Sequence, residues 1–442
     1  MSIVGRVAAA LTQLLGPLAD QADRATHLIV RTRKFTARSL TRTFVLGALQ
    51  NPNASDEQLA HVAARCGVDV TPQAIEARHT PKLAAFLEDL FRRAIRVVIG
   101  AERVVAPILQ RFTAVTLLDS TVIGLPDGQH QRFAGCGGRG ACTRAALKLQ
   151  TELDLRTGAV THVDIASGRD ADSSTARQHV RRAKGSLRIT DLGYFCASVF
   201  AAMVAQGAHF LSRLQFGTGI RVPDGTAVDV LEWLSQQGGP TVDQPILLGL
   251  EERVACRLIA WRVPQEQADR RRRKLHQQFK RKWRKAPSAA RVAWCAWTIL
   301  VTSVPQELLN VTEAAVLYRA RWQVELLFKR WKSQGRVAVL DGRSELRQLI
   351  RVWCRLLAVL VDHWLMVGAA WGEARISPWK ACRAVRAWVD RIVAESDRPE
   401  ELQRTLDAFN QVVARTCRRH RRKKPGTFEL LNDPSLFDLH LT

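Results

Sequence analysis

The fold is decided by one stretch, Tyr318-Arg-Ala-Arg321-Trp-Gln-Val-Glu325-Leu-Leu-Phe-Lys-Arg-Trp-Lys332. It contains neither Pro nor Gly and is rich in Leu, Arg, Lys and Glu, so it predicts one helix. At about 100° per residue, Tyr318, Arg321, Glu325 and Lys332 share a sector of roughly 60°. A carboxylate held among cations suits a metal ion that faces a polyphosphate, and a solvated amphipathic helix is the plain alternative.

The spacing Tyr-(2)-Arg-(3)-Glu-(6)-Lys resembles the signature of a large subgroup of bacterial insertion-sequence transposases, the IS-four type. This resemblance implies a DDE transposase with a ribonuclease H-like catalytic core, whose three acids are two Asp and one Glu. With Glu325 as the third acid, two Asp residues are expected upstream, each associated with a hydrophobic strand.

Two such Asp residues are present. Asp119 interrupts the apolar, β-branched run from Ala114 to Pro126, where a lone acid is costly unless it is paired or binds a metal. Asp191 ends a short strand that begins at Ser186, and a helix is expected from Gly193 through Ala205. Carboxylates at strand ends beside helix starts are where α/β sheets place their chemistry. Taken alone, Asp191 is equally compatible with a helix N-cap.

The resemblance implies a role for each of these side chains. Asp119, Asp191 and Glu325 are the expected catalytic residues and the ligands of two divalent ions. Mg²⁺ is expected because all the ligands are hard oxygens, and Mn²⁺ is its expected substitute. The implied reaction is cut-and-paste transposition, in which metal-dependent cleavage, a hairpin intermediate and strand transfer follow one another. The expected DNA-binding residues are Tyr318, Arg321, Lys332 and Trp297.

Trp297 opens a strand-like run that ends at Pro305. In relatives, a Trp at this spacing from Tyr318 stacks against a base turned out of the duplex, a contact worth about 1–3 kcal/mol. A Trp at a strand start is otherwise an ordinary core residue, and Trp294 lies close by. The sequence leaves these alternatives open.

The charge of the chain fits a partner rich in phosphate. Among 442 residues, 66 are Lys or Arg and 41 are Asp or Glu, which gives a net charge of +25. Such a balance is typical of proteins that bind DNA, although RNA, ribosomes or anionic membranes would also attract it. The nine Cys residues form no Cys-x-x-Cys pair, which favours reduced thiols over a zinc ribbon or a disulfide framework.

The order of helix-like and strand-like segments, together with the resemblance, predicts a multidomain α/β protein. It would have a ribonuclease H-like core, a β-rich insertion and flanking helical regions. The core also includes an expected hairpin with a turn at Thr157-Gly158 and an expected helix over 173–183. The predicted divisions are a helical N-terminal DNA-binding region (1–105), the first part of the core (106–215), the insertion (216–296), the second part of the core (297–345) and a helical C-terminal region with a basic tail (346–442).

Two segments outside the core are further candidates for DNA contact. Residues 55–67 and 71–78 resemble a helix-turn-helix, and a plain helical hairpin is nearly as well supported. The run from Asp269 to Lys285 is dense in Arg and Lys. Such a run is usually a solvated helix, but in a DNA-binding chain it favours a phosphate-binding arm.

The expected location is the bacterial cytoplasm, in association with the nucleoid. The N-terminus lacks a signal-peptide pattern. The best membrane candidate, Leu356 to Trp371, is short and carries Asp362 and His363, so it is interpreted as a buried helix.

The expected partners are double-stranded DNA, as inverted-repeat ends and target, and a second copy of the chain in a synaptic homodimer. Two other functions remain. A non-catalytic DNA-binding regulator would explain the charge but not three separated acids. A ribonuclease H-like nuclease without strand transfer would share the metal chemistry, but the long insertion and the Tyr-Arg-Glu-Lys spacing argue against it.

Overall fold

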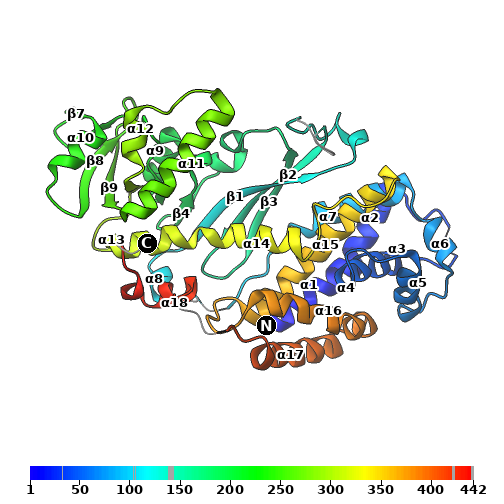
Figure 1. Ribbon diagram of the computed structural model, residues 1–442. Coiled ribbons are helices and arrows are strands. Elements are labelled where there is room, and N and C mark those ends of the chain that lie inside the picture. The colour runs from blue at the N-terminus through cyan, green and yellow to red at the C-terminus, as the bar shows by residue number, and fades with distance from the viewer. Residues whose placement is uncertain (32, 103, 105, 138–143, 421–423, 440–442) are drawn as a thin grey trace. The chain divides into compact units, whose positions relative to one another are not determined.

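The computed structural model is a mixed α/β protein (Figure 1), and it describes residues 1–31, 33–102, 104, 106–137, 144–420 and 424–439. Residues 421–423 of the predicted basic tail lie outside this description. The chain forms two compact units, each made of three segments. The first unit comprises Met1–Val105, Ser120–Asp170 and Gln323–Lys423, and the second comprises Ala106–Asp119, Ala171–Trp322 and Lys424–Thr442.

The first unit is largely helical. Its helices are α1 (Ile3–Gln13), α2 (Ala19–Thr26), α3 (Ala37–Thr41), α4 (Gly47–Gln50), α5 (Asp56–Arg65), α6 (Pro72–Glu76), α7 (Pro81–Ala94), most of α14 (Trp322–Ser333), α15 (Glu345–Ala370), α16 (Pro378–Glu395) and α17 (Pro399–Thr416). Two π-helical turns, Leu14–Leu18 and Arg42–Leu46, join neighbouring helices.

Helix α15 is the centre of this helical core, and it packs against α7, α4, α16 and α17. It is long and apolar enough to cross a bilayer, but 89% of its most apolar window is buried inside the structure. This burial confirms the interpretation of Leu356 to Trp371 as part of a core helix.

The pair α5 and α6 begins where the sequence predicts. Ser55 caps α5 in a reciprocal capping box with Gln58, and Thr71 caps α6 ahead of Pro72. However, α6 is only five residues long, and its Glu76 accepts a hydrogen bond of 2.7 Å from Arg347. DNA reading by this short helix stays a prediction.

The first unit also holds a β-hairpin of β2 (Ala146–Asp154) and β3 (Val160–Ser167), which confirms the turn predicted at Thr157-Gly158. Gly158 has φ +74°, and a Cβ there would lie 2.2 Å from the Trp371 ring. Both the left-handed backbone and the close indole therefore require glycine. The end of β1 (Val115–Gly124) lies beside β2, so the strand order in this unit is β3-β2-β1.

The second unit contains the longer part of the sheet, in the order β1-β4-β5-β10-β9-β8-β6-β7. The strands not yet defined are β4 (Leu187–Thr190), β5 (His209–Arg213), β6 (Ile220–Arg221), β7 (Ala227–Val228), β8 (Thr241–Leu248), β9 (Val254–Arg262) and β10 (Trp297–Thr302). Neighbours β1, β4 and β5 run parallel, and the remaining pairs are antiparallel. The unit's helices are α8 (Pro107–Gln110), α9 (Ala197–Ala205), α10 (Val230–Gln236), α11 (Gln265–Trp283), α12 (Ala289–Trp294), α13 (Val311–Ala320) and α18 (Thr427–Asn432).

The prediction of a helix over 173–183 is wrong. The chain forms two short 3₁₀ turns there, Asp172–Ser174 and Ala176–His179. The guanidinium of Arg188, which is buried in β4, donates to the carbonyl oxygens of Gln178 and Arg177 at 3.3 and 2.9 Å. These carbonyls satisfy a buried cation instead of a helical hydrogen-bond ladder.

The single helix expected from Tyr318 to Lys332 is also wrong in one respect, because α13 ends at Ala320 and α14 begins at Trp322. Between them, the Arg321 amide donates to the carbonyl of Tyr318 at 3.2 Å, which is a three-residue turn in place of the α-helical spacing. Tyr318, Arg321, Glu325 and Lys332 therefore do not lie on one stripe of a single continuous helix.

Candidate active site across three parallel strands

Asp119 and Asp191 occupy corresponding positions on neighbouring strands. In the parallel pair of β1 and β4, Leu118 lies opposite Thr190, and each Asp is the next residue along its chain. Both side chains are half-buried. Asp191 precedes a 3₁₀ turn but makes no side-chain capping bond with it, so it does not serve as the helix cap that the sequence left open. The strand register thus brings together two of the three predicted acids.

A third charged residue follows the same register. In the parallel pair of β4 and β5, Thr190 lies opposite Ser212, so Arg213 comes next to Asp191 in the row. One row across three adjacent strands therefore contains Asp119, midway along β1, Asp191, directly after β4, and Arg213, at the end of β5. Arg213 was not among the residues predicted from the sequence. Its signal was weak, since an Arg at the end of a short strand is common, and only the pairing of β4 with β5 gives it meaning.

Arg321 forms an ion pair with Asp119 in this row. Its Nη1 lies 3.5 Å from Asp119 Oδ2, and only 10% of its side chain is exposed. A guanidinium is also the group that best fits the oxygens of a phosphate. The turn at Arg321 places this predicted phosphate-binding residue beside a predicted catalytic acid.

Tyr318 lies in the same part of the second unit. Burial raises the pKa of the Tyr318 phenol to about 12, and the negative charge of Asp191 is the second cause of this rise. The charges of Arg213 and Arg321, and a hydrogen bond with Arg321, partly oppose this rise in pKa. Tyr318 therefore keeps its proton at neutral pH and can act as a neutral hydrogen-bond donor.

The remaining two members of the motif lie on α14 in the first unit. Glu325 is half-buried in the first turn of that helix, and Lys332 is exposed near its end. Among the residues described, no group of three or more His, Cys, Asp or Glu side chains is close enough to hold a metal ion. The oxygen ligands that the second unit gathers by itself are those of the Asp119 and Asp191 pair, and both are of the kind that Mg²⁺ prefers.

Residues 110–361 match the family described as Transposase DDE domain. The chain belongs to this transposase family. It is similar to the transposase for insertion sequence element IS231F of Bacillus thuringiensis subsp. israelensis, at 22% identity over 445 residues, covering 93% of this chain and 91% of the relative. It is similar to the IS231D transposase of B. thuringiensis subsp. finitimus, at 24% identity, with 78% and 76% covered. A third similar protein is the IS1151 transposase of Clostridium perfringens, at 23% identity, with 66% and 65% covered. Membership of the DDE transposases implies an enzyme of transposition that depends on divalent metal.

Trp297 has a different setting from the one expected of a DNA-binding residue in a transposase. Its side chain opens β10 and is only 5% exposed, within the hydrophobic core of the second unit. The guanidinium of Arg262 lies over the indole, 4.6 Å from its centre. Trp297 is therefore a core residue, and the Arg262 guanidinium covers one face of its ring. Trp294 is partly exposed and makes an edge-on contact with Phe216, with ring centres 5.3 Å apart.

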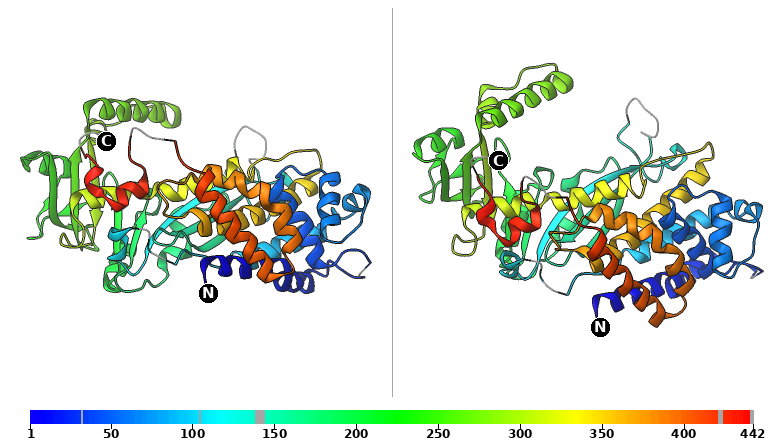
Figure 2. Two further views of the ribbon diagram at one scale, coloured as in Figure 1. Left: turned by 90° about the horizontal axis from the view of Figure 1, so that it is seen from below. Right: turned by 60° about the horizontal axis from the view of Figure 1, so that its bottom comes forward.

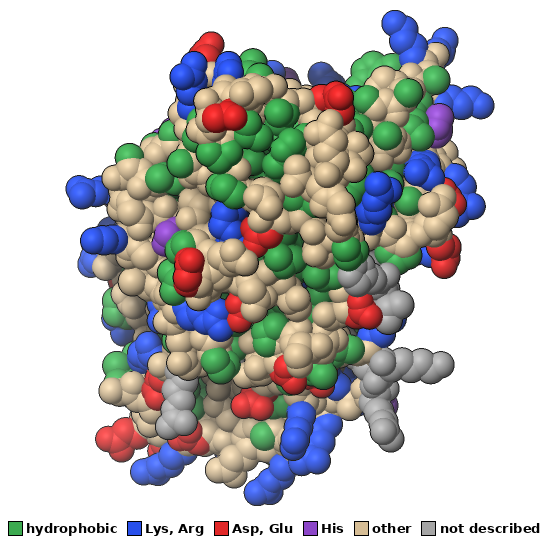
Figure 3. Space-filling model, turned by 90° about the vertical axis from the view of Figure 1, so that its left-hand side faces the viewer, with side chains coloured by type: hydrophobic (Ala, Val, Ile, Leu, Met, Phe, Trp, Pro, Cys, Tyr) green, Lys and Arg blue, Asp and Glu red, His purple; other side chains and the backbone are tan. Residues whose placement is uncertain are grey.

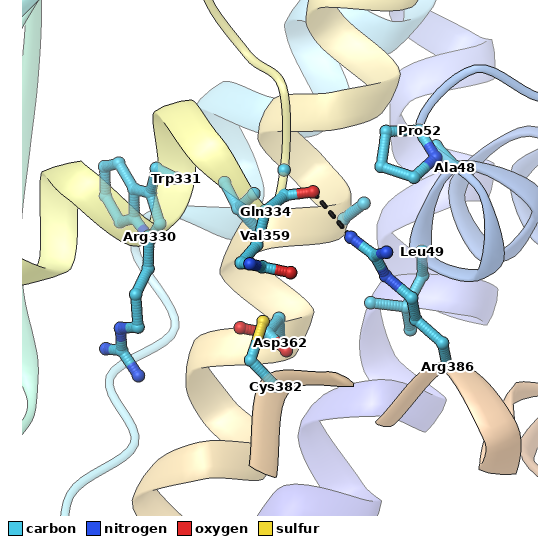
Figure 4. A pocket seen from close by; sticks show the side chains of 12 residues that line it. Ala48, Leu49, Pro52, Arg330, Trp331, Gln334, Val359, Asp362, Cys382 and Arg386 are labelled. Atoms are coloured by element: carbon cyan, nitrogen blue, oxygen red, sulfur yellow. Dashed lines mark hydrogen bonds between the residues drawn. The ribbon is translucent and has the colours of Figure 1, made fainter. Parts of the chain in front are cut away.

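The first unit of this transposase also buries a polar cluster beside α15 (Figure 4). Asp362 lies next to Cys382 there, and burial raises the pKa of the Asp362 carboxyl to about 6. Arg386 donates to the carbonyl of Gln334 at 2.7 Å. The neighbouring His363 is also buried, which lowers its pKa to about 3. This cluster lies among core helices, and we assign it to stability.

Proposed function

We propose that the chain catalyses cut-and-paste transposition of a bacterial insertion sequence, with Asp119, Asp191 and Glu325 as catalytic residues. The observation that carries this proposal is the matched register of Asp119 and Asp191 on β1 and β4. The strand order β3-β2-β1-β4-β5, with β1, β4 and β5 parallel, supports a ribonuclease H-like core. The β8 and β9 hairpin between Asp191 and Glu325 supports the β-rich insertion.

The three acids would hold two divalent ions, Mg²⁺ or Mn²⁺, because all their ligand atoms are hard oxygens. Bound there, the ions would supply an activated water or 3′-hydroxyl and would stabilise the leaving oxygen of an in-line displacement at phosphorus. The pairing of β1 with β4 sets the backbones of the two Asp residues side by side, which would limit the reorganisation needed when their carboxylates engage the ions.

The cationic and phenolic groups would act on the DNA itself. Arg321 and Arg213 would bind non-bridging phosphate oxygens near the scissile bond, since both lie with Tyr318 beside the acids. Tyr318 would donate one hydrogen bond from a phenol that stays protonated. Lys332, which is exposed on α14, would contact a phosphate farther along the strand. The hairpin intermediate and the synaptic homodimer belong to the same proposal, as does a cytoplasmic, nucleoid-associated location.

The test is cleavage of the element's own ends. The inverted repeats that flank the coding region would be placed in a labelled duplex and incubated with the purified full chain in Mg²⁺ or EDTA. A nick, a hairpin and then insertion into a second DNA support the proposal. Nicks without strand transfer would indicate a nuclease, and specific binding without any metal-dependent cleavage would indicate a regulator.

A further inference from the structure

Helix α11 is an arm of the second unit that the proposed catalytic site does not use. It extends over Gln265–Trp283, and Ala268 is its only buried residue. Both views in Figure 2 show it projecting from the strands of its own unit. Its base is anchored, since Arg271 donates to the Trp297 carbonyl at 2.9 Å and to Thr298 Oγ1 at 3.1 Å.

The outer half of the arm is strongly cationic. From Arg273 to Lys285 the chain has seven Lys or Arg residues and no Asp or Glu. Figure 3 shows Lys and Arg side chains, with a His, gathered on the projecting lobe at the upper right. Cations gathered without counter-charge create a positive potential that attracts a polyanion.

The cations are sorted onto one side of α11. At about 100° per residue, Arg273, Lys274, Lys280 and Arg281 lie within a sector of roughly 120°. The opposite side carries Leu275, Phe279 and Trp283.

The apolar side contacts the body of the same unit at Phe279, whereas Trp283 at its end is 50% exposed. The Arg291 guanidinium lies over both Phe279 and Phe216, at 5.6 and 4.5 Å from the ring centres. The cationic side therefore faces outward.

The four cations of this outer stripe are free to bind. All are exposed, and none pairs with an acid in the part of the chain that the structure describes. On the same helix, Arg270 pairs with Glu266 at 3.0 Å, and Arg272 pairs with Asp269 at 2.8 Å. The acids of α11 are thus confined to its anchored base, and the outer stripe is left without counter-charge.

We propose that the outer stripe of α11, formed by Arg273, Lys274, Lys280 and Arg281, binds the phosphate backbone of duplex DNA without reading its sequence. Arg273 and Lys280 are seven residues apart, which is about 10 Å along a helix. Duplex DNA carries one negative charge per about 1.7 Å of its axis, so the stripe can meet several phosphates at once. The partner is taken to be duplex DNA because this inference rests on the proposed transposase function.

The experiment compares the full chain with a variant in which all four stripe residues are changed to Gln. Gln forms helices about as well as Lys and Arg, so α11 should remain folded, which circular dichroism would check. The probe is a random-sequence duplex of about 30 base pairs, titrated between 50 and 200 mM salt. Four lost phosphate contacts make the slope of log K against log salt less steep by about 3 to 4. Between 50 and 200 mM salt, the factor by which affinity falls should therefore be roughly 100 times smaller for the variant than for the wild type.

The matched control removes the same number of charges elsewhere. Arg383, Arg391, Arg404 and Arg415 are exposed on α16 and α17, and all four would be changed to Gln. The proposal holds if the salt slope falls for the α11 variant and stays within one unit of wild type for this control. Equal falls in both would mean that only net charge matters, and the proposal would be wrong.

A second measurement uses the unaltered chain. Trypsin cuts after exposed Lys and Arg, and both Lys280 and Arg281 are exposed near the end of the arm. Duplex DNA should slow cleavage at these two sites several-fold more than cleavage at Arg404. Protection by single-stranded RNA but not by duplex DNA would assign the stripe to RNA and overturn the proposal.

The two proposals fail separately. If the stripe variant keeps the wild-type salt slope while the wild type still cleaves its ends in Mg²⁺, this inference is wrong and the transposase proposal stands. If the stripe variant loses DNA binding but neither the wild type nor the variant cleaves DNA, this inference stands and the transposase proposal is wrong.

Discussion

Arg321 Nη1 lies 3.5 Å from Asp119 Oδ2, although 202 positions separate the two residues in the sequence. Both side chains are largely withdrawn from solvent. The pair connects the signature that begins at Tyr318 with the first of the predicted acids. It also compensates the charge of an acid placed inside a hydrophobic strand, which would otherwise destabilise β1.

Removing Arg321 should therefore destabilise the protein as well as slow cleavage. We expect Arg321→Ala to lower the free energy of unfolding by about 1–3 kcal/mol, because it removes the guanidinium from beside the largely buried Asp119 carboxylate. In a double-mutant cycle with Asp119→Asn, measured by urea unfolding without metal, the two losses should not add. Simple additivity would show that the 3.5 Å contact contributes nothing to stability.

The three acids should be needed for chemistry and not for DNA binding. Asp119→Ala, Asp191→Ala and Glu325→Ala should each abolish Mg²⁺-dependent cleavage of the element's ends, since each loses a metal ligand. Gel-shift affinity for the same DNA should stay within a few-fold of wild type. Glu307→Gln, at an exposed position, is the matched control and should cleave normally. Near-normal cleavage by one of the Ala variants would remove that residue from the catalytic set.

Tyr318 should act as a protonated donor throughout the usual pH range. Its pKa of about 12 lies above that of an ordinary Tyr, so the phenol stays neutral below about pH 10. Tyr318→Phe should lower the cleavage rate about tenfold, the worth of one hydrogen bond, by the same factor from pH 7 to pH 9. An alkaline limb of the rate profile that disappears in the Phe variant would contradict a neutral Tyr318.

Trp297 should be tested as a core residue against its role in base stacking. Because its indole is buried, Trp297→Ala should lower the free energy of unfolding by about 3–5 kcal/mol. Trp294→Ala, at a partly exposed position, should lower it less. If Trp297→Ala were stable and slowed hairpin formation far more than the first nick, with an abasic site at the flipped position relieving the defect, the stacking role would be restored.

Asp362 should make the protein less stable as pH rises. Its pKa is raised from 3.8 to about 6 in the folded state, so the unfolding free energy falls between about pH 4 and pH 6 as the buried carboxyl ionises. The fall amounts to about 2–3 kcal/mol. Asp362→Asn should remove it, so urea unfolding should show the variant gaining relative to wild type at pH 8 but not at pH 4.

The adjacent His363 works in the opposite direction. Its lowered pKa makes the folded state less stable as pH falls below 6.5, because the unfolded chain then takes up a proton more readily. The comparison of wild type with Asp362→Asn cancels this contribution. A difference between the two proteins that does not change with pH would show that folding does not raise the pKa of Asp362.

Local pattern determined much of this protein. The apolar runs around Asp119 and before Asp191, the Thr157-Gly158 turn and the caps at Ser55 and Thr71 all led to the observed elements. Each depends on side-chain periodicity, backbone freedom or a cap within a few residues, which the sequence states directly. The resemblance at Tyr318–Lys332 likewise pointed to the family that residues 110–361 match.

Only the tertiary structure decided which distant residues meet. The pairing of β4 with β5 brings Arg213 into line with Asp191. Arg188 binds the carbonyl oxygens of Gln178 and Arg177, which would otherwise accept hydrogen bonds within the expected helix. The burial of Trp297 under Arg262 likewise follows from strands packed far from it in sequence. These outcomes depend on strand register and on the competition of buried polar groups for partners, which no window of neighbouring residues contains.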